Sequence, residues 1–171
     1  MARQYAALKM KMGVWTYYVV SMKMYELASD IKFSTEISEQ KTTIDKTLQR
    51  EIEKGRADKV IPNYLIRNDE RFFGSIVVAA MGGKPVFFPI EIANKQDFKM
   101  VQDDIRETFG VLTFDSSIDT YALDGQHRLQ AIKQLINKPA DFSTPSEFRN
   151  ETISVIFIEQ PENSSRDDFI K

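Results

Sequence analysis

The stretch from residue 120 to residue 139 constrains the fold most, because it changes from a strand pattern to a helix pattern across a glycine. Residues 120–123 (TYAL) are predicted as a short strand. Apolar side chains then recur at helical spacing until a proline ends the pattern, at Leu129, Ile132, Ile136 and Pro139. Five consecutive residues, all polar or glycine, separate the two patterns: Asp124, Gly125, Gln126, His127 and Arg128. The sequence therefore predicts a strand that turns directly into a helix.

The rest of the chain alternates between strand and helix patterns. Strands are predicted over residues 15–24, 86–92, 111–114 and 153–158, and the apolar run 72–81 fits a strand or a buried helix. The run 153–158 is uninterrupted, which is typical of a strand covered on both faces. Helices are predicted over residues 36–54, from Pro62 through Leu65, and over residues 98–109, where Gly110 would end the helix.

Gly82 and Gly83 predict a turn that joins residues 72–81 and 86–92 in a hairpin, and Pro89 indicates an edge strand or a bulge. Neither a repeat nor a low-complexity linker divides the chain. We therefore expect a single domain over residues 1–171 of the α/β (α+β) class, with a mixed sheet and flanking helices. Residues 166–171 resemble the opening of another helix, so we expect this domain to be the N-terminal part of a longer protein.

Composition excludes several classes of function. The 171 residues carry a formal net charge of −2, which is unlike a polybasic protein that binds nucleic acid by bulk charge. Without cysteine and with one histidine, His127, the chain lacks the ligands of thiolate and multi-histidine metal sites, and we predict no metal site. No segment approaches the ~20 apolar residues that span a bilayer, and the start lacks a signal-peptide pattern. We expect a cytoplasmic protein with no membrane partner.

The five residues of the junction suit an anion. A helix that begins directly after a strand and a glycine directs several backbone N–H groups to one point, where the helix dipole adds about half a positive charge. Arg128 offers a planar fork for a phosphate or carboxylate, and Gln126 can orient a water or contact a base edge. His127 can exchange protons near neutral pH.

The same residues also have a purely structural interpretation, and the sequence leaves both open. Asp124 would cap the helix, and its carboxylate would pair with Arg128 four residues later. Gly125 would relieve a tight turn, and His127 would donate to a carbonyl.

The pentapeptide, followed by residues 129–132 (LQAI), resembles the DGQHR-domain family, and within it the DndB proteins of DNA sulfur modification. All five positions match, and the resemblance extends from about Trp15 onward. It implies a fold similar to the ParB/sulfiredoxin type, with the DGQHR junction as a phosphate site. It also implies a DNA-binding transcriptional regulator, a repressor that binds its own operon promoter, in a bacterial system that places phosphorothioate sulfur in DNA. Other DNA modification proteins are implied partners, and the sulfur-transfer enzyme is a different component.

An alternative is a domain that binds or hydrolyses a nucleotide, with a nucleoside triphosphate and Mg²⁺ as cofactor. Gly125 and Gln126 would hold phosphate, Arg128 would neutralise charge, Asp124 would bind Mg²⁺ or a ribose hydroxyl, and His127 would activate water. In an enzyme the catalytic residues would be Asp124, Gln126, His127 and Arg128. A carboxylate beside phosphate is repulsive, so this hypothesis predicts metal dependence.

Basic residues elsewhere supply further candidates. Lys41, Lys46 and Arg50 recur on one side of the predicted helix 36–54 and are the candidate DNA contacts. The start of the chain would form a phosphate-binding arm or a solvated tail through Arg3, Lys9 and Lys11. Arg67 and Arg71 would support a phosphate site or pair with Asp69 and Glu70. Four methionines are interpreted as core residues: Met10, Met12, Met22 and Met24.

Overall fold

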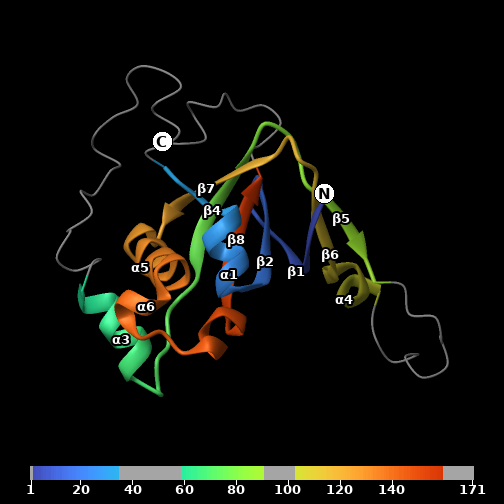
Figure 1. The fold of residues 1–171 in the computed structure, drawn as a ribbon. Coiled ribbons are helices and arrows are strands. Elements are labelled where there is room, and N and C mark those ends of the chain that lie inside the picture. The colour runs from blue at the N-terminus through green and yellow to red at the C-terminus, as the bar shows by residue number, and fades with distance from the viewer. Residues whose placement is uncertain (1, 35–58, 91–102, 160–171) are drawn as a thin grey trace.

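The computed structural model describes residues 2–34, 59–90 and 103–159, which fold around an eight-stranded mixed sheet (Figure 1). The strand order is β3-β7-β4-β8-β2-β1-β6-β5. The strands are β1 (Arg3–Met12), β2 (Trp15–Lys23), β3 (Lys32–Phe33), β4 (Ile76–Met81), β5 (Val86–Pro89), β6 (Phe109–Phe114), β7 (Asp119–Asp124) and β8 (Thr152–Glu159). The helices are α1 (Met24–Asp30), α3 (Ile61–Arg67), α4 (Asp103–Thr108), α5 (Gln126–Asn137), α6 (Pro139–Phe142) and the 3₁₀ helix η2 (Ser146–Asn150). The prediction of a mixed sheet with flanking helices is confirmed.

One face of the sheet carries the main core. On β2, the side chains of Tyr18, Val20 and Met22 are buried while the residues between them are more exposed, as the period of two predicts. The buried faces of α1 and α5 pack over this side of the sheet, where Leu27 and Leu129 are fully buried (Figure 1). This helix-covered face therefore holds the larger of the two buried hydrophobic clusters in the described part of the chain.

The start of the chain is neither a phosphate arm nor a solvated tail. It forms β1, which pairs with β2 on one side and β6 on the other. The Arg3 guanidinium donates to the carbonyl oxygen of Ile118 at 2.5 Å and lies over the ring of Phe114 at 5.4 Å. Lys9 lies over the ring of Phe87 at 5.7 Å. The sequence did not indicate this, because the pairing partner β6 lies about a hundred residues away.

The predicted hairpin of residues 72–81 and 86–92 is wrong. The first segment does form a strand, β4, but it pairs with β7 and β8 and not with β5. Five of its six residues are buried, which suits a central strand. β5 pairs with β6 and lies at the edge of the sheet, where Pro89 was expected.

The predicted end of the helix at Gly110 is also wrong. α4 ends at Thr108, and Gly110 lies inside β6 opposite Ala7 and Pro89. A Cβ atom at this position would collide with the carbonyl oxygen of Phe88, so the glycine permits close approach of two strands.

Other predictions have mixed outcomes. The short helix at Pro62 is confirmed as α3, and Pro139 follows the end of α5. Met22 and Met24 are buried as core residues, whereas Met12 is 68% exposed and does not fill the core. The predicted helix 36–54, with Lys41, Lys46 and Arg50, lies outside the described residues. Within the described ranges, no helix is long and apolar enough to cross a membrane.

Candidate functional site

The DGQHR residues lie at a sharp change of direction from β7 to α5. β7 ends at Asp124, α5 begins at Gln126, and Gly125 between them has φ 84° and ψ 20°. L-residues with a Cβ atom rarely adopt this left-handed conformation. A Cβ atom on Gly125 would also lie 3.0 Å from Cγ1 of Ile76 and 3.1 Å from Nη2 of Arg128. Both the backbone angle and the close packing therefore require glycine.

Two side chains of the motif connect the end of β7 to its neighbouring strands. Gln126 Nε2 donates to Oγ of Ser34, the residue after β3, at 2.6 Å. Arg128 Nη1 donates to the carbonyl oxygens of Gly74 at 2.5 Å and Ser75 at 3.2 Å, just before β4. We call this set of contacts the three-strand clamp, because it links the end of β7 to β3 and β4. Its five residues are Gln126, Arg128, Ser34, Gly74 and Ser75.

The position of the clamp follows from the sheet topology. β3 runs parallel to β7 and β4 runs antiparallel to it, so the end of β3 and the start of β4 both lie beside the end of β7. Side chains that project from the first turn of α5 therefore reach both neighbouring strands. This arrangement gives Gln126 and Arg128 a structural role.

Asp124 does not cap the helix, contrary to the structural interpretation of the sequence. The N-cap residue of α5 is Gly125, and no side chain donates or accepts there. The expected ion pair with Arg128 is present, with Oδ2 of Asp124 3.5 Å from Nη2. The Asp124 side chain is 73% exposed, whereas that of Arg128 is 22% exposed. The pair is therefore a partly solvated contact of small energy.

The groups that a ligand could use at the junction are mainly backbone N–H groups. The first backbone bond of α5 runs from the N–H of Leu129 to the carbonyl of Gly125. The backbone N–H groups before Leu129 lie ahead of this first hydrogen bond of the helix. They form the end of α5 at which the helix dipole is positive. His127 lies on the same turn and is partly buried. This arrangement can bind an anion, although the contacts of Arg128 with two carbonyls and the exposed carboxylate of Asp124 both oppose a highly charged phosphate.

Arg71 lies in a second polar cluster, but not with the predicted partners. Its Nε donates to Oε2 of Glu151 at 3.1 Å, its Nη2 contacts Oε1 of the same carboxylate, and its Nη1 donates to the carbonyl of Asn68 at 3.1 Å. The hydrogen bonds to Glu151 raise the pKa of the Arg71 guanidinium. For Arg71, the alternative of pairing with Asp69 or Glu70 is therefore wrong. The partner Glu151 lies 80 residues away, and no local pattern could have indicated it.

The described part of the chain does not contain a preformed set of metal ligands. Among the described residues, no group of three or more His, Asp or Glu side chains is placed to hold a metal ion. Asp124 is the acidic residue of the junction, and Arg128 lies next to it.

The fold and the junction together define a mixed α/β domain in which a strand–glycine–helix turn joins three strands of one sheet. A family model described as DndB, DNA-sulfur modification-associated, matches residues 5–171. The chain belongs to this family, whose members are associated with DNA sulfur modification, and the resemblance inferred from the pentapeptide is confirmed. The comparison with curated proteins and the comparison with solved structures give no match.

Proposed function

We propose that this chain is a DNA-binding transcriptional repressor in a DNA phosphorothioate modification system, acting in the cytoplasm on its own operon promoter. The observation that carries the proposal is the family match over residues 5–171. DNA and the other proteins of the modification system are the partners that follow from it.

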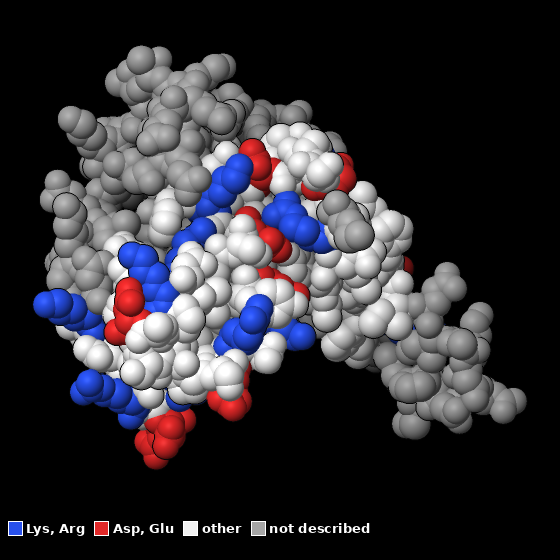
Figure 2. Space-filling model, viewed as in Figure 1, with Lys and Arg blue, Asp and Glu red and all other residues white. Residues whose placement is uncertain are grey.

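A net charge of −2 requires the DNA contacts to be local. Figure 2 shows Lys and Arg side chains on the helix-covered side, with acidic residues between several of them. Exposed basic residues of this region occur at the end of α3, after α5 and in η2: Arg67, Lys138 and Arg149. These cations are spread out, which favours contacts with separate phosphates over one dense patch.

The DGQHR junction is proposed as one of these phosphate contacts. The backbone N–H groups at the start of α5 would donate to a single phosphate oxygen, and the three-strand clamp would hold them in place. In this arrangement Gly125, Gln126 and Arg128 shape the site, and Asp124 and His127 lie at its rim. The second part of the proposed surface is the set Lys41, Lys46 and Arg50, which follows β3 in the chain.

The test is fluorescence anisotropy of the chain with a labelled fragment of its own promoter and with a scrambled fragment, over a series of salt concentrations. We expect tighter binding to the promoter and a logarithmic affinity that falls linearly with the logarithm of salt concentration, with a slope of about −0.9 for each phosphate contact. Replacing Lys41, Lys46 and Arg50 with Ala should make that slope shallower by about 1 for each phosphate that the chain no longer neutralises.

Lys11→Ala is the matched control, because Lys11 is exposed at the end of β1, in the hairpin with β2. It should leave affinity and slope unchanged. Equal affinity for promoter and scrambled DNA, or binding that does not respond to salt, would reject the proposed function.

A further inference from the structure

The sheet face opposite α1 and α5 is apolar across most of its width. One row of neighbouring residues crosses β6, β1, β2, β8 and β4 on this side, and the backbone N–H of Ile90 bonds to the carbonyl of Phe109 at 2.9 Å to extend the row past β5. Its members are Ile90, Phe109, Leu8, Val19, Ile156 and Val77. None of them is charged or polar. At the β4–β7 end of this side, Ala79, Met81 and Tyr121 are buried in a second cluster. We therefore call only the part of this side at β5, β6, β1 and β2 the open face.

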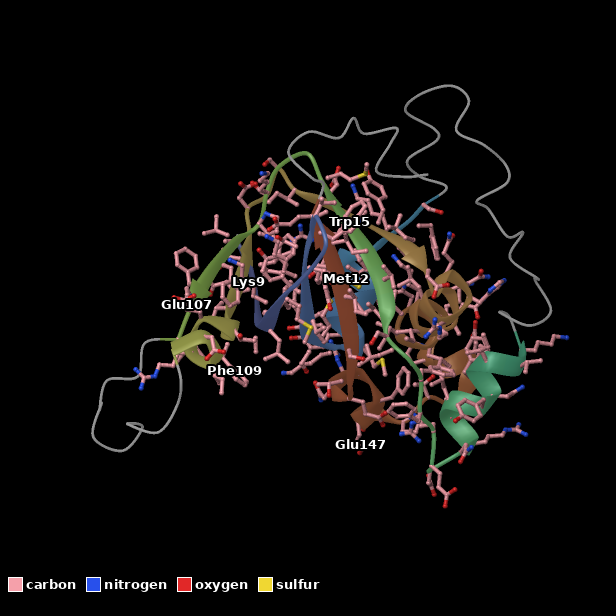
Figure 3. All side chains as sticks on the ribbon, turned by 180° about the vertical axis from the view of Figure 1, so that it is seen from behind. Lys9, Met12, Trp15, Glu107, Phe109 and Glu147 are labelled. Atoms are coloured by element: carbon pink, nitrogen blue, oxygen red, sulfur yellow. The ribbon has the colours of Figure 1, made fainter. Side chains whose placement is uncertain are left out.

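The helices α1 and α5 lie on the other side. Along each strand, the residue next to a member of this row points to the opposite side. Three such residues are buried in the core under these helices: Ala7, Val20 and Val155. Figure 3 views the molecule from behind, with the described strands nearest the viewer and α1 behind them. The apolar row therefore has no described helix packed over it.

One end of the open face is strongly exposed. Of the nine exposed large apolar side chains in the described ranges, five come from β5, β6, α4 and the residue after β5. Their exposed fractions are 52% for Val86, 55% for Phe88, 53% for Ile90, 44% for Ile105 and 50% for Phe109. Such clustering is unusual, since exposed apolar residues on monomeric proteins are normally scattered. We call Phe88, Ile90 and Phe109 the ridge, because their side chains share this face.

A shallow groove lies directly beside the ridge. It has a volume of about 380 Å³, and Ile90 and Phe109 form its wall. Its floor consists of small or medium side chains on the same face, among them Ala6, Leu8, Val19 and Ser21. Large exposed side chains therefore lie next to a groove lined by smaller, uncharged residues.

We propose that a second copy of this chain packs on the open face, with the ridge of each copy in the groove of the other. A ridge and a groove side by side on one surface are self-complementary about a two-fold axis, which is the usual symmetry of a homodimer. The absence of charge from the ridge and the groove floor argues against DNA as the occupant, because nucleic acid requires cationic contacts.

The exposed area is sufficient for a weak specific dimer. A fully buried aromatic side chain removes about 150–250 Å² from water. Phe88 and Phe109 are about half exposed, and together with Val86, Ile90 and the groove floor they supply on the order of 500 Å² per copy. Two copies would then bury about 1,000 Å², which is the lower limit for a specific interface. The dimer should therefore dissociate measurably on dilution.

Sedimentation equilibrium of the chain over a range of concentrations tests the proposal. We expect the mass to rise with concentration from 19.7 kDa toward twice that value. Phe109→Lys places a charge in the interface and should raise the dimer dissociation constant at least about tenfold, equivalent to 1.4 kcal/mol. Phe88→Lys, on the exposed edge strand, should have the same effect and serves as a second variant if the first one folds poorly.

Phe72→Lys is the matched control, because Phe72 is 84% exposed and lies outside the open face, beside Tyr64 of α3. It should leave the dissociation constant unchanged, and thermal melts should show that all variants fold. A wild-type chain that remains monomeric at every concentration overturns the proposal. A dimer that persists unchanged in both Phe109→Lys and Phe88→Lys overturns it as well. Neither result depends on DNA binding, so the two proposals fail separately.

Discussion

Arg128→Met tests whether the last residue of the DGQHR motif acts mainly as part of the three-strand clamp. Methionine keeps an unbranched apolar stem of similar reach and removes the guanidinium. In the native structure, that group donates to the carbonyls of Gly74 and Ser75 at 2.5 and 3.2 Å. The substitution therefore removes the connection between α5 and the start of β4 with little change in packing.

The expected loss of stability follows from these contacts. A hydrogen bond from a charged donor contributes about 1.5–3 kcal/mol, and the two carbonyls share one nitrogen, so we treat them as one such hydrogen bond. The ion pair with Asp124 adds only a few tenths of a kcal/mol, roughly, because that carboxylate is 73% exposed. We expect a decrease of about 2 kcal/mol in the free energy of unfolding, which lowers the melting temperature by about 4–8 °C in a domain of this size.

Two measurements together locate the effect. Urea unfolding gives the change in the free energy of unfolding, and amide hydrogen exchange reports local opening. Exchange should accelerate at the start of β4, near Ile76, more than in β1 or β2. Asp124→Asn is the control, since it removes the ion pair and leaves both carbonyl contacts in place.

The clamp would be refuted by an Arg128→Met variant with wild-type stability and unchanged exchange at β4. The guanidinium would then be available for a ligand, and calorimetry with ATP, GTP and CTP, with and without Mg²⁺, would test the nucleotide alternative. Heat that depends on Mg²⁺ and disappears in Arg128→Met would favour that alternative.

Three further predictions concern stability. Gly125→Ala should cost about 2–3 kcal/mol, because alanine is strained at positive φ and its methyl group would press on neighbouring atoms; Gly13→Ala, at φ 58° with open space around it, should lose less in the same thermal melt. Burial raises the pKa of Tyr5 and of Tyr18, so the unfolded chain releases these protons near pH 10 while the folded chain retains them. Stability should fall above about pH 10 by up to 1.4 kcal/mol per pH unit for each tyrosine, and replacing both with Phe should flatten urea-derived stability above about pH 10; an unchanged slope would contradict this assignment. Arg71→Ala leaves its partly buried carboxylate partner unpaired and should cost about 1–2 kcal/mol in urea unfolding, with Arg71→Lys recovering part of the loss.

Local patterns predicted the elements around the junction well. The spacing of Leu129, Ile132 and Ile136 places the core-facing side of α5 correctly, since helical period depends only on backbone geometry. The alternation in β2 likewise identified its buried face. Both predictions concern residues within a few positions of one another.

Strand pairing could not be predicted in the same way. Residues 72–81 and 86–92 are joined by two glycines, which is a valid hairpin signal, yet β4 pairs with β7 and β8. The alternatives differ in contacts between segments roughly 40 to 80 residues apart, and a local pattern contains no information about them. The same reason explains why β1 looked like a solvated tail.

The motif itself shows both sides of this division. Its residues alone indicated a strand that ends in a glycine turn and a helix whose first N–H groups converge on one point, because those features depend on neighbouring backbone angles; the pentapeptide also identified the family. The tertiary structure decided which groups Gln126 and Arg128 contact, since Ser34, Gly74 and Ser75 come near only when β3 and β4 assemble on either side of β7. It likewise decided that one face of the sheet lies under α1 and α5 while the opposite face of the described strands is lined by an apolar row, because that depends on where helices pack and not on the sequence of any one strand.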